Sequence, residues 1–130
     1  GVTAPVWVPL RAVTTIHDRQ IARHGGAQGL RDLGLLENAL ARPLNAHVYG
    51  ETAIDALGAS YAFGLAKAHA FVDGNKRTAF VTAVTFVRLN GWTFRPSPID
   101  GVRTMEGLAA GEVSETAFAA WLRGGMKRLP

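Results

Sequence analysis

Two apolar segments with helical spacing, residues 54–70 and 75–90, are separated by only a short polar stretch. In the first segment, Leu57, Tyr61 and Leu65 recur at intervals of four residues, and paired apolar residues recur similarly in the second. Side chains spaced three and four residues apart lie on one face of an α-helix. The sequence therefore predicts a helix, a tight loop and a second helix at the centre of the chain.

The polar stretch, residues 69–78, reads His-Ala-Phe-Val-Asp-Gly-Asn-Lys-Arg-Thr. Gly74 permits a sharp turn, and consecutive N–H groups after such a turn form a concave site for an anion. The N-terminus of the second helix adds unpaired N–H groups and a partial positive charge. Lys76 and Arg77 add full charges, and an arginine can bind phosphate oxygens with two prongs. We therefore expect a phosphate site.

Two residues of this stretch supply reactive groups. His69 can accept a proton near neutral pH, and Asp73 is a hard oxygen ligand that could hold Mg²⁺ against a phosphate. A histidine at the edge of an apolar helix face is often a hydrogen-bonded core residue. The eight residues that follow favour a catalytic base instead.

The rest of the chain predicts further helices separated by turns. Thr52 to Asp55 matches a capping box, and Ser97 and Ser114 are expected helix caps. The chain predicts an all-α fold in one domain over residues 1–130. The other helices are expected over residues 10–23, 34–42, 97–110 and 114–123, with extended pieces at residues 1–9 and 92–94.

Two connecting segments leave alternatives open. Residues 25–29, Gly-Gly-Ala-Gln-Gly, lack the Lys-Ser/Thr ending of a P-loop, which favours a plain connector over a second phosphate loop. Residues 44–50 follow Pro43, which disfavours continuation of a helix. We therefore expect residues 44–50 to form a loop.

Composition excludes several classes of protein. With 130 residues, 48% hydrophobic and 18% charged, the chain suits a folded globule. The net charge of +4 is spread from Arg11 to Arg128 without a dense basic run, so direct nucleic-acid binding is not expected. No apolar run reaches the ~18 residues of a membrane span, and we see no signal peptide at residues 1–3. Without cysteines, a cytoplasmic protein is expected.

The stretch at residues 69–78 resembles the death-on-curing (Doc) branch of the Fic/Doc family, whose signature is roughly His-x-Phe-x-Asp-x-Asn-Lys-Arg-Thr. Ala70 stands where proline is common, and residues 16–32 also look like the N-terminal part of Doc-type proteins. The resemblance implies a compact helical bundle of about six helices with a short flap or extended segments. The matched positions are His69, Phe71, Asp73, Asn75, Lys76, Arg77 and Thr78.

Enzymes of this fold transfer part of a nucleotide to a protein hydroxyl group. The resemblance implies that His69 takes the hydroxyl proton, that Asp73 holds Mg²⁺, and that ATP is the substrate. Phe71 would anchor the loop to the core. The residues assigned to phosphate are Gly74, Asn75, Lys76 and Arg77, with Lys67 as a weaker candidate.

The family also has a flap beside the active site that aligns the target protein. By that resemblance, residues 43–50 are the candidate target-docking flap; an ordinary surface loop is the alternative reading. The flap residues are Pro43, Leu44, Asn45, Ala46, His47, Val48 and Tyr49.

Lys76 distinguishes two reactions within the family. Members that transfer AMP have glycine at this position, which leaves room for a nucleotide phosphate. In Doc-type proteins the nucleotide is reversed and presents its γ-phosphate, so the resemblance implies a kinase toxin. Its implied target is a threonine of elongation factor Tu, with inhibition of translation. AMP transfer and a catalytically silent binding module remain the alternatives.

Regulation is inferred from a missing pattern. Many Fic enzymes carry an inhibitory helix with the pattern Ser/Thr-x-x-x-Glu-Gly/Asn, which does not occur in residues 1–130. We therefore expect inhibition by a separate antitoxin of the prevents-host-death type.

Overall fold

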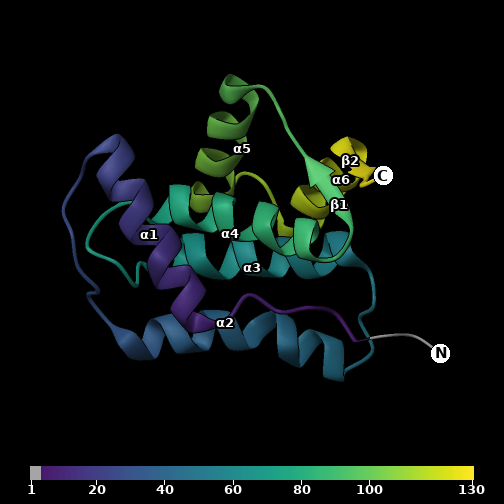
Figure 1. The fold of residues 1–130 in the computed structure, drawn as a ribbon, viewed down its shortest axis with the longest axis horizontal. Coiled ribbons are helices and arrows are strands. Elements are labelled where there is room, and N and C mark those ends of the chain that lie inside the picture. Colours follow the sequence, from purple (N-terminus) through teal and green to yellow (C-terminus); the bar gives the residue numbers. More distant parts are fainter. Residues whose placement is uncertain (1–3) are drawn as a thin grey trace.

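The computed structural model describes residues 4–130, and over that range it contains six helices and two short strands (Figure 1). The all-α prediction is confirmed. The expectations for residues 1–3 lie outside the described range. The elements are α1 (Leu10–His24), α2 (Leu33–Val48), α3 (Ile54–Ala68), α4 (Asn75–Leu89), β1 (Trp92–Phe94), α5 (Pro98–Ala110), α6 (Glu115–Gly125) and β2 (Met126–Arg128).

Helix α3 forms the centre of the core and is packed against α2, α4 and α6. Small residues let these neighbours come close. A Cβ atom on Gly58 would lie 3.3 Å from side-chain atoms of both Val87 and Leu122, and one on Gly64 would lie 3.2 Å from the Ala39 carbonyl oxygen. Burial on nearly every side explains why α3 is apolar around most of its circumference.

Helix α4 lies beside α3, as the helix–loop–helix prediction requires (Figure 1). Its buried residues Ala79, Ala83, Phe86 and Val87 recur at the predicted helical spacing, whereas Phe80 and Val84 are half-buried. The threonines expected on another face are partly inside as well, because Thr78 and Thr82 are buried. Each fully buried large side chain contributes about 1.5–3 kcal/mol to stability. The pair thus fixes the position of the short loop between them.

Helix α1 packs on α4 and presents Val13, His17 and Ile21 to the interior. These three residues are spaced four apart, so they form one face. Figure 1 shows α1 crossing the pair near the α3–α4 loop. The position of α1 brings a buried histidine to that loop.

The expected end of the second helix at residue 42 is wrong, because α2 continues through Pro43 to Val48. A proline inside a helix costs about 3 kcal/mol, since it lacks the N–H donor and crowds the preceding turn. Here Pro43 is buried together with Leu36, Ala39 and Leu40. Burial of this face against α3 offsets the cost and keeps the helix intact.

The chain ends in a small feature that local patterns did not predict. Strand β2 pairs antiparallel with β1, with Trp92 opposite Arg128 and Phe94 opposite Met126. Helix α6 includes Gly125, whose absent Cβ would lie 2.7 Å from the Phe94 ring. Contact between distant segments therefore decides how this helix ends.

The predicted caps have mixed outcomes. Ser97 accepts a hydrogen bond from the Asp100 N–H, and Ser114 accepts one from the Ala117 N–H, as expected. Helix α3 instead begins after Ala53, without a side-chain cap. Over residues 4–130, no helix has the length and apolar character that a membrane crossing requires.

Candidate functional site

The motif loop (residues 69–74) joins α3 to α4 at the left of Figure 1. His69 ends α3 in the left-handed conformation with φ of 49°, and Gly74 begins α4 with φ of 75°. The left-handed backbone conformation is unfavourable for most residues other than glycine, so the His69 backbone is strained. This conformation places the exposed His69 at the start of the loop.

Asn75 closes the loop by hydrogen bonding to Phe71 in both directions. Its Oδ1 accepts from the Phe71 N–H at 3.0 Å, and its Nδ2 donates to the Phe71 oxygen at 2.9 Å. One Nδ2–H group therefore remains for a ligand. The structure gives Asn75 a loop-closing role that the assignment to phosphate did not include.

Phe71 is buried, as expected of an anchor, and its ring stacks on His17 of α1. The two ring centroids are 3.9 Å apart and the planes differ by 9°. The side chain therefore fixes the middle of the loop to the core, leaving neighbouring residues exposed.

The α1–α2 connection (residues 25–32) is hydrogen-bonded to the motif loop and supports it. Leu30 and Phe71 make an antiparallel bridge, the Val72 N–H donates to the Gly29 oxygen at 3.0 Å, and the Arg31 N–H donates to the Ala70 oxygen at 2.7 Å. This segment is a connector, as expected, but it also pairs with the motif. The sequence did not predict this pairing.

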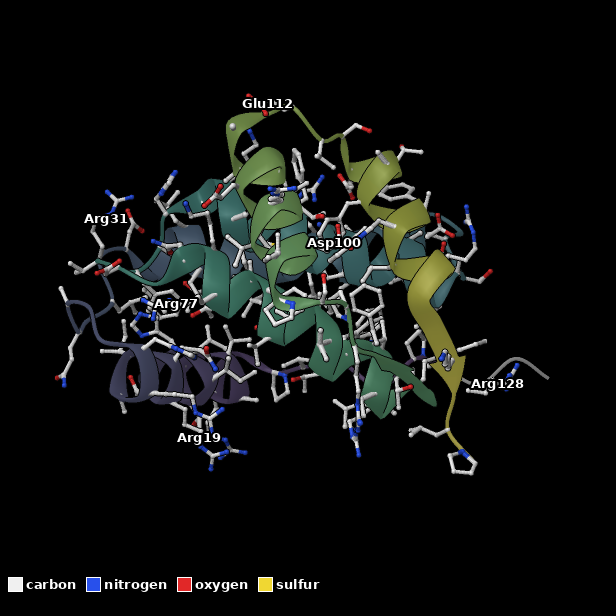
Figure 2. The ribbon with its side chains drawn as sticks, turned by 90° about the horizontal axis from the view of Figure 1, so that it is seen from above. Arg19, Arg31, Arg77, Asp100, Glu112 and Arg128 are labelled. Carbon is white, nitrogen blue, oxygen red and sulfur yellow. The ribbon has the colours of Figure 1, made fainter. Side chains whose placement is uncertain are left out.

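Arg31 also contacts the strained end of α3. Its Nε and Nη2 donate to the His69 carbonyl oxygen at 2.8 and 2.5 Å. A carbonyl at a helix C-terminus lacks an intrahelical donor, so a guanidinium group is a favourable partner. Figure 2 shows Arg31 at the same end of the molecule as Arg77.

Asp73 is held by backbone N–H groups on both carboxylate oxygens. Oδ1 accepts from Gly74 at 2.8 Å, and Oδ2 accepts from Ala27 at 3.2 Å. These two hydrogen bonds, Gly74 first, lower the pKa of Asp73, and the charges of Arg77 and His17 lower it further. The exposed carboxylate therefore stays ionised and directed.

The N-terminus of α4 offers free donors, although not all those expected. The Gly74 N–H is occupied by Asp73, so it is not free for phosphate. The first helical bond joins the Thr78 N–H to the Gly74 oxygen. Within residues 4–130, no acceptor contacts the N–H groups of Asn75, Lys76 and Arg77. These three free donors at a helix N-terminus are suited to binding an anion.

A pocket of about 470 Å³ brings the predicted residues together. Its lining joins the exposed base, the carboxylate and the cationic helix end on one surface. This arrangement suits an anionic ligand that reacts beside a base. The lining residues are His69, Val72, Asp73, Gly74, Asn75, Lys76, Arg77 and Ala109.

The pocket residues fit a divalent cation that binds together with a phosphate-bearing ligand. No three His, Cys, Asp or Glu side chains of residues 4–130 gather as a metal site. Mg²⁺ commonly uses one or two carboxylates, with phosphate oxygens and waters completing its shell. Asp73, ionised and on the pocket wall, can supply that single carboxylate.

Lys67 and Arg77 make different contacts, and only Arg77 lines the pocket. The Lys67 Nζ donates to the Ala109 oxygen at 3.1 Å, tying α3 to the end of α5. It does not line the pocket. Arg77 lines the pocket while its Nη2 donates to the Gly25 oxygen at 3.0 Å. Among the candidate cations, Lys76 and Arg77 are thus the ones on the pocket wall.

The candidate target-docking flap is not a loop and does not reach the pocket. Residues 43–48 are helical, and none of residues 43–49 lines the pocket. The ring centroid of His47 lies 5.6 Å from that of Trp7. Arg42, just before the flap, donates to the backbone oxygen of Ser60, which lies nine residues before His69. The docking role stays a prediction that no contact with the site supports.

A larger groove of about 710 Å³ opens beside the pocket, between α1, α4 and α5. It shares Lys76 and Arg77 with the pocket, and its floor includes Phe80, Val84 and Met105. An apolar surface therefore adjoins the cationic end of α4.

Sequence reasoning missed three contributors to the site: His17, Ala27 and Arg31. The signal was the glycine-rich segment, because Gly25, Gly26 and Gly29 all adopt positive φ. A Cβ atom on Gly26 would lie 2.7 Å from the Asp73 Oδ2. These glycines permit the backbone to approach the motif closely.

Comparisons with known proteins identify the family of this chain. Residues 7–87 match the model of the Fic/DOC family. The chain is 38% identical over 109 residues to "Protein kinase doc" of Escherichia phage P1, covering 83% of this chain and 86% of that protein. It is 50% identical over 70 residues to "Toxin Doc" of Mycolicibacterium smegmatis, covering 52% and 53%.

The matched region includes every residue that lines the pocket except Ala109. Helix α1, the connection at residues 25–32 and the motif loop all lie within residues 7–87. The family match therefore covers the motif loop and the segments that support it. The chain belongs to the Fic/DOC family and is of its Doc type.

Proposed function

We propose that this chain is a Doc-like toxin that transfers the γ-phosphate of ATP to a Thr or Ser hydroxyl of a protein. The convergence of His69, Asp73 and the free N–H groups of α4 on one pocket carries the proposal. Similarity to a protein named as a kinase supports the choice of reaction.

Each part of the pocket has a role in this reaction. His69 takes the proton as the hydroxyl oxygen bonds to the γ-phosphorus, and ADP leaves as the β–γ bridging bond breaks. The N–H groups of residues 75–77, with Lys76 and Arg77, stabilise the charge on the phosphate oxygens. Asp73 would hold Mg²⁺, which neutralises phosphate charge when bound.

Lys76 favours phosphate transfer over AMP transfer. Its side chain is exposed and lines the pocket at the N-terminus of α4. A bulky cation there occupies the space that a glycine would leave for a nucleotide phosphate. AMP transfer is the second candidate, and Lys76→Gly tests whether this position determines the choice.

The target in this proposal is a threonine of elongation factor Tu, whose modification would stop translation in the cytoplasm. The resemblance to Doc toxins carries this choice of target. Purified elongation factor Tu should therefore accept label from the enzyme. Replacement of the modified threonine, identified by mass spectrometry, should abolish labelling.

A separate antitoxin of the prevents-host-death type is proposed as the inhibitor. The absence of an inhibitory helix pattern in this sequence supports it. The apolar groove shares Lys76 and Arg77 with the pocket, so a chain lying in it would reach the phosphate site. Copurification of a stably bound small protein encoded beside the toxin gene supports the proposal. Toxicity that no neighbouring gene product relieves contradicts it.

The deciding experiment is transfer of label from ATP in bacterial lysate with Mg²⁺. ATP carries label at the γ- or the α-phosphate, and His69→Ala is the control. Label from the γ-position only, lost in the variant, is the expected result. Label from the α-position contradicts phosphate transfer and favours AMP transfer. Absence of both labels, together with no Mg²⁺-dependent binding of ATP by calorimetry, favours a silent module.

A further inference from the structure

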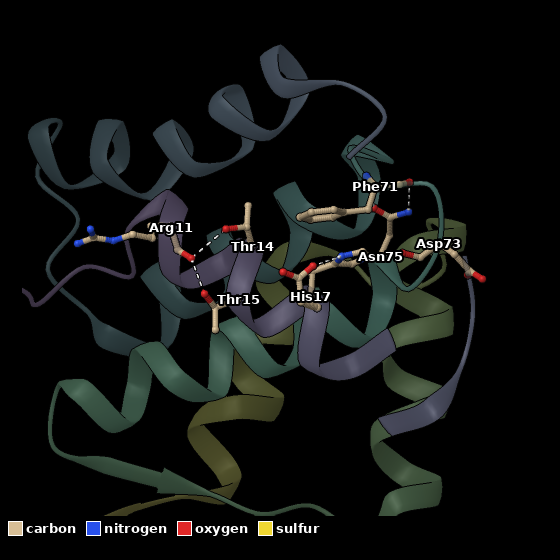
Figure 3. A network of polar contacts seen from close by, with 8 residues as sticks. Arg11, Thr14, Thr15, His17, Phe71, Asp73 and Asn75 are labelled. Carbon is tan, nitrogen blue, oxygen red and sulfur yellow. Dashed lines mark hydrogen bonds and ion pairs between the residues drawn. The ribbon is translucent and has the colours of Figure 1, made fainter. Parts of the chain in front are cut away.

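One buried titratable side chain beside the site has no part in the proposed chemistry. His17 of α1 is 2% exposed, and its Nε2 lies 2.7 Å from the backbone carbonyl oxygen of Asp73. Figure 3 shows His17 between α1 and the motif loop, with Phe71 and Asp73 above it. The contact spans 56 residues of sequence.

The geometry assigns the proton on this ring. A carbonyl oxygen only accepts hydrogen bonds, so Nε2 must carry a proton and donate. The ring plane is fixed as well, because it stacks on Phe71 with the planes 9° apart. The opposite nitrogen, Nδ1, lies 3.8 Å from the exposed carboxylate of Asp18. His17 therefore has a defined direction toward Asp73.

The rest of this α1 face leaves the loop little room to move. A Cβ atom on Gly74 would lie 3.0 Å from the Ile21 Cδ1 and 3.6 Å from the His17 Nε2. The loop thus rests directly on His17 and Ile21. In addition, the Ala27 N–H donates to the Asp73 carboxylate.

We infer that His17 is a positioning residue for the transfer reaction: its Nε2–H holds the Asp73 backbone so that the carboxylate faces the pocket. Without this donor, the Asp73 carbonyl would have to find another partner, and the peptide could turn. A displacement of about 1 Å at a reacting centre can cost about 100-fold in rate. The kinetic consequence rests on the proposed function, whereas the effect on the loop does not.

Two substitutions separate the hydrogen bond from the packing. His17→Phe keeps an aromatic ring against Phe71 but removes the donor. His17→Gln retains an N–H donor on a side chain of similar reach. Tyr61→Phe is the matched control, because it removes a buried side-chain contact, the Tyr61–Val8 hydrogen bonds, eight residues before His69 on α3.

The first measurement is steady-state transfer of γ-label, at a temperature where all variants are folded by circular dichroism. We expect His17→Phe to lower kcat by about tenfold or more with little change in the KM for the protein target. His17→Gln should recover most of the loss. Tyr61→Phe should lower the melting temperature but leave kcat unchanged.

The second measurement is hydrogen–deuterium exchange of the loop, which needs no substrate. The N–H groups of Phe71, Val72 and Gly74 are hydrogen-bonded in the structure. We expect them to exchange faster in His17→Phe than in the unmodified chain, with little change in Tyr61→Phe.

Some outcomes would overturn the inference. Full kcat in His17→Phe contradicts it, as does an equal loss in His17→Gln, since the donor would then be irrelevant. If the unmodified chain transfers no label, the proposed function fails and the exchange result alone decides on His17. Unchanged exchange in His17→Phe then overturns the positioning role, and faster exchange there alone supports it.

Discussion

The motif loop and the aromatic cluster (Trp7, Tyr61 and Phe86) both join segments that are far apart in sequence, but they do so by different means. In the cluster, Phe86 lies 5.7 Å from Trp7 and 5.0 Å from Tyr61 between ring centroids. The loop is instead linked by hydrogen bonds between backbone groups and the side chains of Asn75, His17 and Arg31.

The difference follows from what each region must expose. Packing can fix Phe86 because the side chain is completely buried. His69 and Asp73 must remain accessible to a ligand, so packing cannot hold their side chains. Hydrogen bonds to the neighbouring backbone hold the loop instead. Four substitutions or conditions test this contrast, from the largest expected effect to the smallest.

His69→Ala should reduce transfer by about 100- to 10,000-fold, because general bases contribute rate factors of that size. Its stability should change little, since the side chain is exposed and both residues face the same backbone strain. The measurements are kcat/KM for label transfer and a thermal melt. Retained activity would remove His69 from the proposed mechanism.

Phe86→Ala should lower the free energy of unfolding by about 3–5 kcal/mol through lost burial and a cavity. Molecules that remain folded should transfer label at the normal rate. Urea denaturation gives the stability, and kcat corrected for the folded fraction gives the activity. A specific loss of kcat would show that the aromatic cluster and the loop are coupled.

Gly26→Ala and Gly25→Ala form a matched pair within the α1–α2 connection. Both positions have positive φ, 118° and 80°, so both substitutions should cost about 1–3 kcal/mol in backbone strain. Only Gly26 would bring a Cβ atom against Asp73, at 2.7 Å from Oδ2, whereas Gly25 has open space.

We therefore expect Gly26→Ala to lose about tenfold or more in transfer, and Gly25→Ala to lose stability alone. Mg²⁺ titration of transfer should require higher Mg²⁺ for Gly26→Ala, because the carboxylate is displaced. Equal kinetics in the two variants would show that this connection does not control Asp73.

The smallest expected effect is a pH dependence of stability from Asp73. Its hydrogen bonds from Gly74 and Ala27 lower its pKa below the usual 3.8, so the unfolded chain takes up this proton first as the pH falls. The stabilisation is therefore complete above the unfolded pKa and is lost as the pH falls through the folded pKa.

Comparison with Asp73→Asn isolates this contribution. The difference in unfolding free energy between the two proteins should be constant near neutral pH and should change below about pH 4. Urea denaturation at several pH values measures it. A difference that is independent of pH would show that the carboxylate charge does not contribute.

The sequence by itself determined the features that depend on neighbouring residues. The spacing of Leu57, Tyr61 and Leu65 predicted α3, because a helix brings residues four apart onto one face. Ser97 and Ser114 predicted two helix starts, since their hydroxyls accept from N–H groups three residues later. The motif residues were recognisable because they lie within ten consecutive positions.

Only the tertiary structure decided the features that depend on distant contacts. Burial against α3 overrode the local tendency of Pro43 to end a helix, and pairing with β1 made residues 126–128 a strand. The same holds for the site, because His17 and Arg31 reach the motif across 56 and 38 residues of sequence. Local spacing carries no information about such contacts, which exist only after the helices pack.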